Sequence, residues 1–97
     1  MDILNLIYES IDEINLDLES GKQIEKREDA ILFGANSNLD SMGLVNLITI
    51  VEQKIEDITG EFISIADERA MSMEYNPFSD VSSLKKHVEM LLDENKN

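Results

Sequence analysis

The chain has 97 residues with eight Lys and Arg against 21 Asp and Glu, a formal net charge of −13, and this length accommodates a single domain. Cys is absent, which excludes a disulfide framework, a thiolate metal site and a Cys nucleophile. A single His argues against a histidine-built metal site. The negative charge predicts repulsion from nucleic acid and anionic membranes, and no apolar run approaches the roughly 20 residues of a membrane span. We therefore expect a cytoplasmic protein whose partners carry basic patches.

Apolar residues at three- and four-residue steps predict an amphipathic helix over residues 3–18, with acidic residues on its other face. Ser20-Gly21 is expected to end this helix, because Gly is the usual residue just past a helix C-terminus. Residues 22–40 show no sustained period and are expected to form a long loop, anchored to the core by residues 31–33. The stripe of the helix consists of Ile3, Ile7, Ile11, Ile14 and Leu18.

A second and more apolar helix is predicted over residues 41–59. Asp40 is placed to cap its N-terminus, since a carboxylate there accepts from backbone N–H groups two or three residues on. Thr59-Gly60 is expected to close it. The apolar face of this helix consists of Leu44, Val45, Leu47, Ile48, Val51, Ile55 and Ile58.

The last third of the chain predicts a short helix near residues 66–71 and a longer one after the break at Pro77-Phe78. Ser79 or Asp80 caps this last helix, and the tail over residues 93–97 is expected to fray. Because no segment shows strand-like alternation, we expect an all-α fold, a small bundle of three longer helices and one short helix. The core stripe of the last helix is Val81, Leu84, Val88, Leu91 and Leu92.

Most catalytic constellations are missing from the sequence, and we expect no enzyme and no metal site. A Ser-His-Asp arrangement would need His87, which follows Lys85 and Lys86 and is interpreted as an ordinary, partly exposed helical residue. The four glycines are scattered and form neither a P-loop nor a dinucleotide fingerprint. The many carboxylates of residues 2–19 are interpreted as a solvated helix face.

The segment Asp40-Ser41-Met42-Gly43 is the exception. It places a hydroxyl at the start of the most apolar helix, where free backbone N–H groups and a partial positive charge favour a phosphate. Gly43 is costly inside a helix, and its missing side chain is interpreted as room for an attachment at Ser41 or for a docking partner. The plainer interpretation is that Asp40 and Ser41 only begin a helix.

Asp40-Ser41-Met42 resembles the Asp-Ser-Leu motif of acyl carrier proteins, in which the serine receives 4′-phosphopantetheine. The segment Leu32-Phe33-Gly34 precedes it as the family's Leu-Gly segment does. Residues 64–71, Asn76-Pro77-Phe78 and Val81-Ser82-Ser83-Leu84 resemble the third- and fourth-helix region of stand-alone carriers. The resemblance covers nearly the whole chain in the right order, and implies a single carrier domain over residues 1–97 with the four-helix acyl-carrier fold.

The resemblance implies a carrier without catalytic activity of its own. A phosphopantetheinyl transferase would attach the arm to Ser41, with Asp40 and Met42 flanking it, and acyl groups would then be held as thioesters for loading and processing enzymes. The protein would be a monomer of a fatty-acid, lipid or polyketide pathway. Candidate residues for lining a cavity that shelters the acyl group are Leu44, Ile48, Ile63, Met71 and Met73; the alternative for each is plain core packing.

Two departures from the family pattern bear on partners. Met42 replaces the usual Leu by an apolar side chain of similar volume. The surface that is acidic in carriers of primary fatty-acid synthesis has lost carboxylates, which points to a dedicated carrier of a specialised pathway. Candidate recognition residues are Gly43, Asn46, Glu52, Glu56 and Asp57. Two alternatives remain open: an aminoacyl or peptidyl carrier serving a synthetase, and an unmodified acidic helical adaptor.

Overall fold

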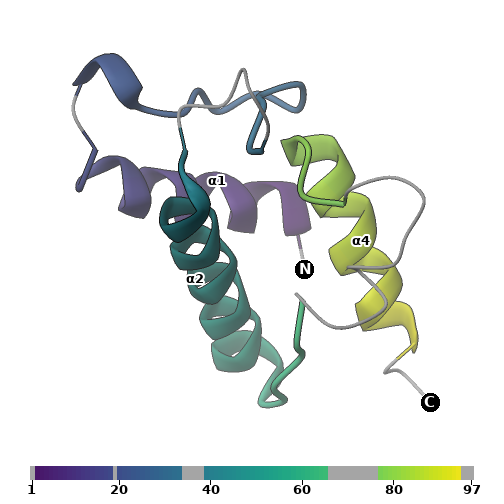
Figure 1. The fold of residues 1–97 in the computed structure, drawn as a ribbon. Helices are drawn as coiled ribbons and strands as arrows, with labels where there is room; N and C mark the ends of the chain where they lie inside the picture. Colours follow the sequence, from purple (N-terminus) through teal and green to yellow (C-terminus); the bar gives the residue numbers. More distant parts are fainter. Residues whose placement is uncertain (1, 19, 34–38, 66–76, 95–97) are drawn as a thin grey trace.

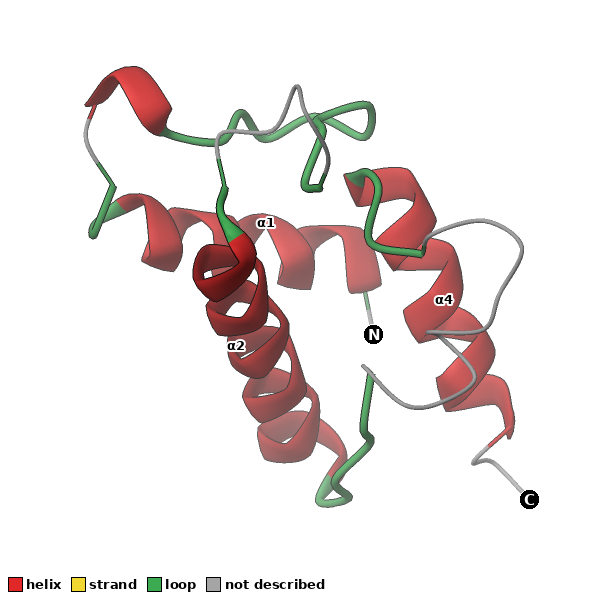
Figure 2. Ribbon diagram, in the orientation of Figure 1, coloured by secondary structure: helices red, strands yellow, loops and turns green. Residues whose placement is uncertain are grey.

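The computed structural model describes residues 2–18, 20–33, 39–65 and 77–94. These residues form three α-helices and one short 3-10 helix, with no strand among them (Figures 1 and 2): α1 (Ile3–Asn15), η1 (Ser20–Lys22), α2 (Ser41–Thr59) and α4 (Val81–Glu94). The predicted all-α class is therefore confirmed for this part of the chain. The short helix expected near residues 66–71 lies outside the described residues.

Helix α1 is shorter than predicted. Asp2 caps it by accepting from the N–H of Asn5 at 3.1 Å, and its apolar stripe is buried as expected. It ends at Asn15, whose side chain both donates to and accepts from the backbone of Ile24, at 2.9 and 2.8 Å, and so ties the end of the helix to the connection that follows. The predicted end at Ser20-Gly21 is wrong, and Leu18, beyond the helix, still packs against the core.

The connection from α1 to α2 is anchored differently from the prediction. Leu32 is fully buried, whereas Ile31 and Phe33 are 42% and 46% exposed, so of these three residues only Leu32 reaches the core. The same connection is also anchored by the buried Ile24, Ala30 and Leu39. The N–H of Leu32 donates to the carbonyl of Ser79 at 2.9 Å, and an isolated antiparallel bridge joins Ile31 to Asp80. This extended backbone makes successive side chains alternate between core and solvent.

Helix α2 has the bounds that its capping residues predicted. Asp40 is its N-cap, and Gly60 ends it in the left-handed conformation with φ of 79°, which glycine adopts without strain. Val45 and Ile58 were assigned to the apolar face but are exposed, because they lie at its margins. The residues of this face that are buried are Leu44, Leu47, Ile48, Val51 and Ile55.

Helix α4 is capped by Asp80, whose carboxylate accepts from the N–H of Ser83 at 2.8 Å. This settles the choice left open between Ser79 and Asp80. The predicted stripe is buried at Val81, Leu84, Val88 and Leu91. Asp93 and Glu94, expected to fray, belong to the helix, and the rest of the predicted tail lies outside the described residues.

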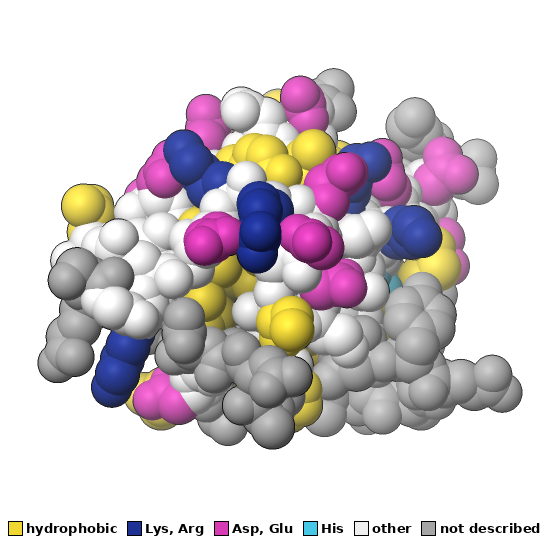
Figure 3. Space-filling model, turned by 90° about the horizontal axis from the view of Figure 1, so that it is seen from above, with side chains coloured by type: hydrophobic (Ala, Val, Ile, Leu, Met, Phe, Trp, Pro, Cys, Tyr) yellow, Lys and Arg dark blue, Asp and Glu magenta, His cyan; other side chains and the backbone are white. Residues whose placement is uncertain are grey.

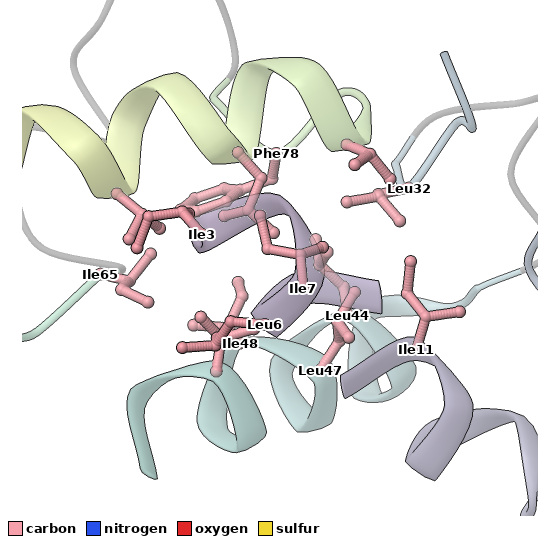
Figure 4. Close-up of a cluster of buried hydrophobic side chains, with 14 of the residues drawn as sticks. Ile3, Leu6, Ile7, Ile11, Leu32, Leu44, Leu47, Ile48, Ile65 and Phe78 are labelled. Carbon is pink, nitrogen blue, oxygen red and sulfur yellow. The ribbon is translucent and has the colours of Figure 1, made fainter. Parts of the chain in front are cut away.

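Helix α1 is the centre of the arrangement and packs against both α2 and α4. Figure 4 shows its side chains Ile3, Leu6 and Ile7 meeting Ile48 from α2 and Phe78 from the segment before α4. The core is thus almost wholly aliphatic, in keeping with a sequence in which aromatic residues make up 5%. Within the described part of the chain, no helix combines the length and the apolar character that crossing a membrane would require.

An ion pair crosses the contact between α1 and α2: Lys54 Nζ lies 2.5 Å from Glu13 Oε2. The hydrogen bond to Glu13 raises the pKa of Lys54 above its usual value of 10.5, although desolvation opposes this. A raised pKa in the folded state means that the pair stabilises the fold below about pH 10 and that this contribution is lost as Lys54 deprotonates.

We expect Lys54→Met to lower the melting temperature by a few degrees at neutral pH, since such pairs contribute about 0.2–1 kcal/mol. The difference from the wild type should shrink above pH 10.5, as measured by circular dichroism melting. Lys26→Met is the matched control, because its pair with Asp12 is more exposed and should contribute less. A difference that grows with rising pH would contradict this account of the pair.

Candidate functional site

The first turn of α2 is built around Asp40. Its backbone is extended, its Oδ1 accepts from the N–H of Gly43 at 2.7 Å, and its carbonyl accepts from the N–H of Leu44 at 3.0 Å. Ser41 is consequently the first helical residue. The N–H groups of this turn carry the positive end of the helix dipole of a 19-residue helix. The Asp-Ser-Met motif therefore has the helix-start position that the sequence predicted.

The structure gives a local reason for a glycine at position 43 that the sequence did not reveal. A Cβ at this position would lie 3.1 Å from Leu39 Cδ2 and 3.2 Å from Asp40 Oδ1, tighter than ordinary van der Waals contact. The absent side chain thus lets Leu39, which is buried, and the capping carboxylate close over the first turn. The space interpreted as room for an attachment or a partner is in part taken up by these two residues.

An open groove with a volume of about 430 Å³ lies between the end of α1 and the first three turns of α2. Met42, 72% exposed, and the exposed Asn46 contribute to it from α2. Its floor is apolar, while Asp17 and Asp40 bring two carboxylates. The lining consists of Ile14, Asp17, Leu18, Asp40, Met42, Gly43, Asn46, Thr49 and Ile50.

The groove unites four predicted site residues with others that the sequence analysis missed. Asp40, Met42 and Gly43 flank or follow the motif serine, and Asn46 was assigned to partner recognition. The residues missed are those of α1 and the turn after it, together with Thr49 and Ile50. The helical spacing of positions 42, 46, 49 and 50 was the available signal, but nothing in the sequence showed that the end of α1 lies opposite them.

The predicted cavity residues lie elsewhere. Leu44, Ile48 and Ile63 are buried in the hydrophobic core and do not line the groove. Met71 and Met73 lie outside the described residues. A sheltering cavity at these positions stays a prediction, and in this structure the first three side chains pack as core.

The three carboxylates assigned to recognition differ in their surroundings. Glu56 and Asp57 are exposed on the last turns of α2. Glu56 follows Ser41 by 15 residues, about 22 Å along the helix axis at 1.5 Å per residue. The carboxylate of Glu52 instead accepts a hydrogen bond from the backbone N–H of Ile65 at 2.7 Å, so it serves the fold of its own chain.

His87 is buried, 1% exposed, and the expectation of a partly exposed residue is wrong. It follows Leu84 by three residues and so shares its buried face. Its Nε2 donates to the carbonyl of Ile65 at 2.9 Å, and its ring packs edge-on against Phe78. Its Nδ1 is buried and has no hydrogen-bond partner among the described residues.

The face formed by the α1–α2 connection carries charges of both signs. Figure 3 shows carboxylates and basic side chains alternating on it with apolar patches, and Arg27 pairs there with Glu25 and Asp29. Among the described residues, no group of three His or carboxylate side chains is placed to hold a metal ion. Comparisons with models of known protein families, with curated proteins and with solved structures give no significant match.

Proposed function

We propose that this chain is an acyl carrier protein that holds 4′-phosphopantetheine on Ser41 and carries acyl groups as thioesters on that arm. The observation that supports this most is the position of the Asp40-Ser41-Met42 motif at the capped start of α2. A phosphodiester at this position would meet the positive end of the helix. The arm supplies the reactive thiol that this Cys-free chain lacks.

In this function the chemical steps are carried out by partner enzymes, not by the chain itself. A phosphopantetheinyl transferase lets the Ser41 hydroxyl displace adenosine 3′,5′-bisphosphate from coenzyme A; the pyrophosphate bond breaks, the hydroxyl proton is released, and the phosphopantetheine becomes a phosphodiester on Ser41. Acyl-loading and acyl-processing enzymes with basic patches act afterwards. The chain itself holds the acyl group, presents it to each enzyme and then dissociates, and it acts as a cytoplasmic monomer in a specialised pathway. The four-helix carrier fold belongs to the same proposal, and it requires the short helix expected near residues 66–71.

Partner recognition is proposed to centre on the groove beside the motif. Met42 offers an apolar contact, and Asp17, with no ion-pair partner among the described residues, offers a charge. Contacts of this kind suit a carrier, since rim charges speed association more than they tighten binding. Glu56 and Asp57 lie too far along α2 to touch a group centred on Ser41, so they would act through longer-range attraction.

We expect Asp17→Lys to reduce kcat/KM for the transferase several-fold and to flatten its dependence on salt, while helicity is kept. Glu9→Lys is the control, since it makes the same charge change on the first half of α1, outside the groove. The measurement is steady-state kinetics at low and moderate ionic strength. Equal effects of the two variants would mean that only net charge matters, and the groove would lose its role in recognition.

Intact-mass measurement tests the function. The purified chain is incubated with coenzyme A, Mg²⁺ and a broad-specificity phosphopantetheinyl transferase, and the mass is expected to rise by one phosphopantetheine. An unchanged mass beside a control carrier that is modified in the same tube would favour the acidic adaptor. Loading the modified chain with a panel of fatty-acyl and aminoacyl groups then separates an acyl carrier from an aminoacyl or peptidyl carrier.

A further inference from the structure

Both polar backbone groups of Ile65 are held by side chains from two different helices. Its N–H donates to Glu52 Oε2 of α2 at 2.7 Å, and its carbonyl accepts from His87 Nε2 of α4 at 2.9 Å. Ile65 is fully buried, and its own side chain belongs to the hydrophobic core. A single residue outside the helices is thus bonded from both sides.

This arrangement matters because of how the helices pack. Helix α1 packs against α2 and against α4, but within the described residues α2 and α4 do not pack directly on each other. Figure 1 shows the segment that contains Ile65 rising between them. On the side away from α1, the link between α2 and α4 in the described residues is therefore the pair of hydrogen bonds to the Ile65 backbone.

We propose that Glu52, Ile65 and His87 form a clip that ties α2 to α4 and acts as one cooperative unit. When either hydrogen bond breaks, the backbone of Ile65 can shift although its side chain stays in the core, and the second bond loses its geometry. A buried amide or carbonyl left without a partner is destabilising, so the half-open clip is disfavoured and both bonds form or break together.

His87 supports this interpretation. To donate to a carbonyl, its Nε2 must carry a proton, and its Nδ1 has no partner in the described part of the chain. A buried imidazole pays a desolvation penalty that an apolar residue would avoid. Among the described residues, this ring has one hydrogen bond, to Ile65, and that bond is the interaction that offsets the penalty.

The clip also bears on cargo, a consequence that rests on the proposed function. Ile48 lies one turn before Glu52, and Ile63 lies two residues before Ile65; both are buried. An acyl group that displaced these side chains from the core would move the segment away from α2, and the 2.7 Å bond to Glu52 would be lost. The clip is therefore the tie that opens when cargo is sheltered there.

A double-mutant cycle tests the cooperativity. The fall in melting temperature caused by Glu52→Ala is measured in the wild type and in His87→Leu, and is expected to be at least halved in the second background. His87→Leu and the double variant both lack the buried Nδ1, so the destabilisation that this unpartnered atom causes does not enter their comparison. Glu13→Gln is the matched control, another α2-binding carboxylate without a share in the clip, and its effect should be the same in both backgrounds. Additive effects of Glu52→Ala would overturn the clip.

Amide hydrogen exchange gives a readout that does not depend on melting. His87→Leu should speed exchange of the Ile65 N–H at least tenfold, although Glu52, which accepts from that N–H, is intact; an unchanged rate would overturn the clip. In chain loaded from octanoyl-coenzyme A, the same N–H should exchange faster than in the unloaded chain, while that of Ile24, held by Asn15, stays unchanged. A chain that is never modified refutes the proposed function alone, whereas a loaded chain with unchanged Ile65 exchange refutes the clip's role in sheltering cargo.

Discussion

Replacing Ser41 by Ala should abolish modification by a phosphopantetheinyl transferase while the fold is kept. Asp40, which caps α2 through its bond to the N–H of Gly43, is untouched by this change. The free energy of unfolding should therefore stay within about 0.5 kcal/mol of the wild-type value. The measurement is intact mass after reaction, together with a melting curve for each protein.

Thr49→Val provides a control for hydroxyl loss in the same helix. Its hydroxyl donates to the carbonyl of Val45, and the residue lines the groove, but the proposal gives it no covalent role. This variant should be modified like the wild type. Modification of the Ser41→Ala chain at any other serine would overturn the assignment of the attachment site.

The largest effect on stability is expected for Leu32→Ala. Leu32 is fully buried and is the most deeply buried of the residues through which the long α1–α2 connection reaches the core. Removing a buried Leu side chain typically costs about 2–5 kcal/mol. For a chain of this length the melting temperature should fall by about 8 °C or more.

Phe33→Ala is the matched comparison, since it removes a larger side chain from the neighbouring position, where nearly half of the residue is exposed. Its effect should be clearly smaller than that of Leu32→Ala. Similar losses for the two variants would mean that the alternation of buried and exposed residues along this segment is not what anchors it.

The elements that the sequence predicted best are those with strong local signals. Helix α2 begins and ends where Asp40 and Gly60 indicate, because a capping carboxylate and a left-handed glycine are determined by neighbouring backbone groups. The buried stripe of α4 followed from spacing alone. The motif at Ser41 could be placed at a helix start for the same reason.

Features that depend on contacts between distant segments could not be predicted in this way. The Asn15 side chain at the end of α1 binds the backbone of Ile24, nine residues on. The burial of His87 depends on a carbonyl acceptor 22 residues away. The groove requires the end of α1 to lie against α2, and helical periodicity within one element does not show which faces of two elements meet.

The central claim concerns one covalent bond, and fragment mass spectrometry tests it most directly. The chain is treated with coenzyme A, Mg²⁺ and a phosphopantetheinyl transferase, then digested, and the fragments are sequenced by mass. The account predicts one phosphopantetheine per chain, located on Ser41. An adduct on a different residue, or none while a known carrier in the same reaction is fully modified, would contradict it.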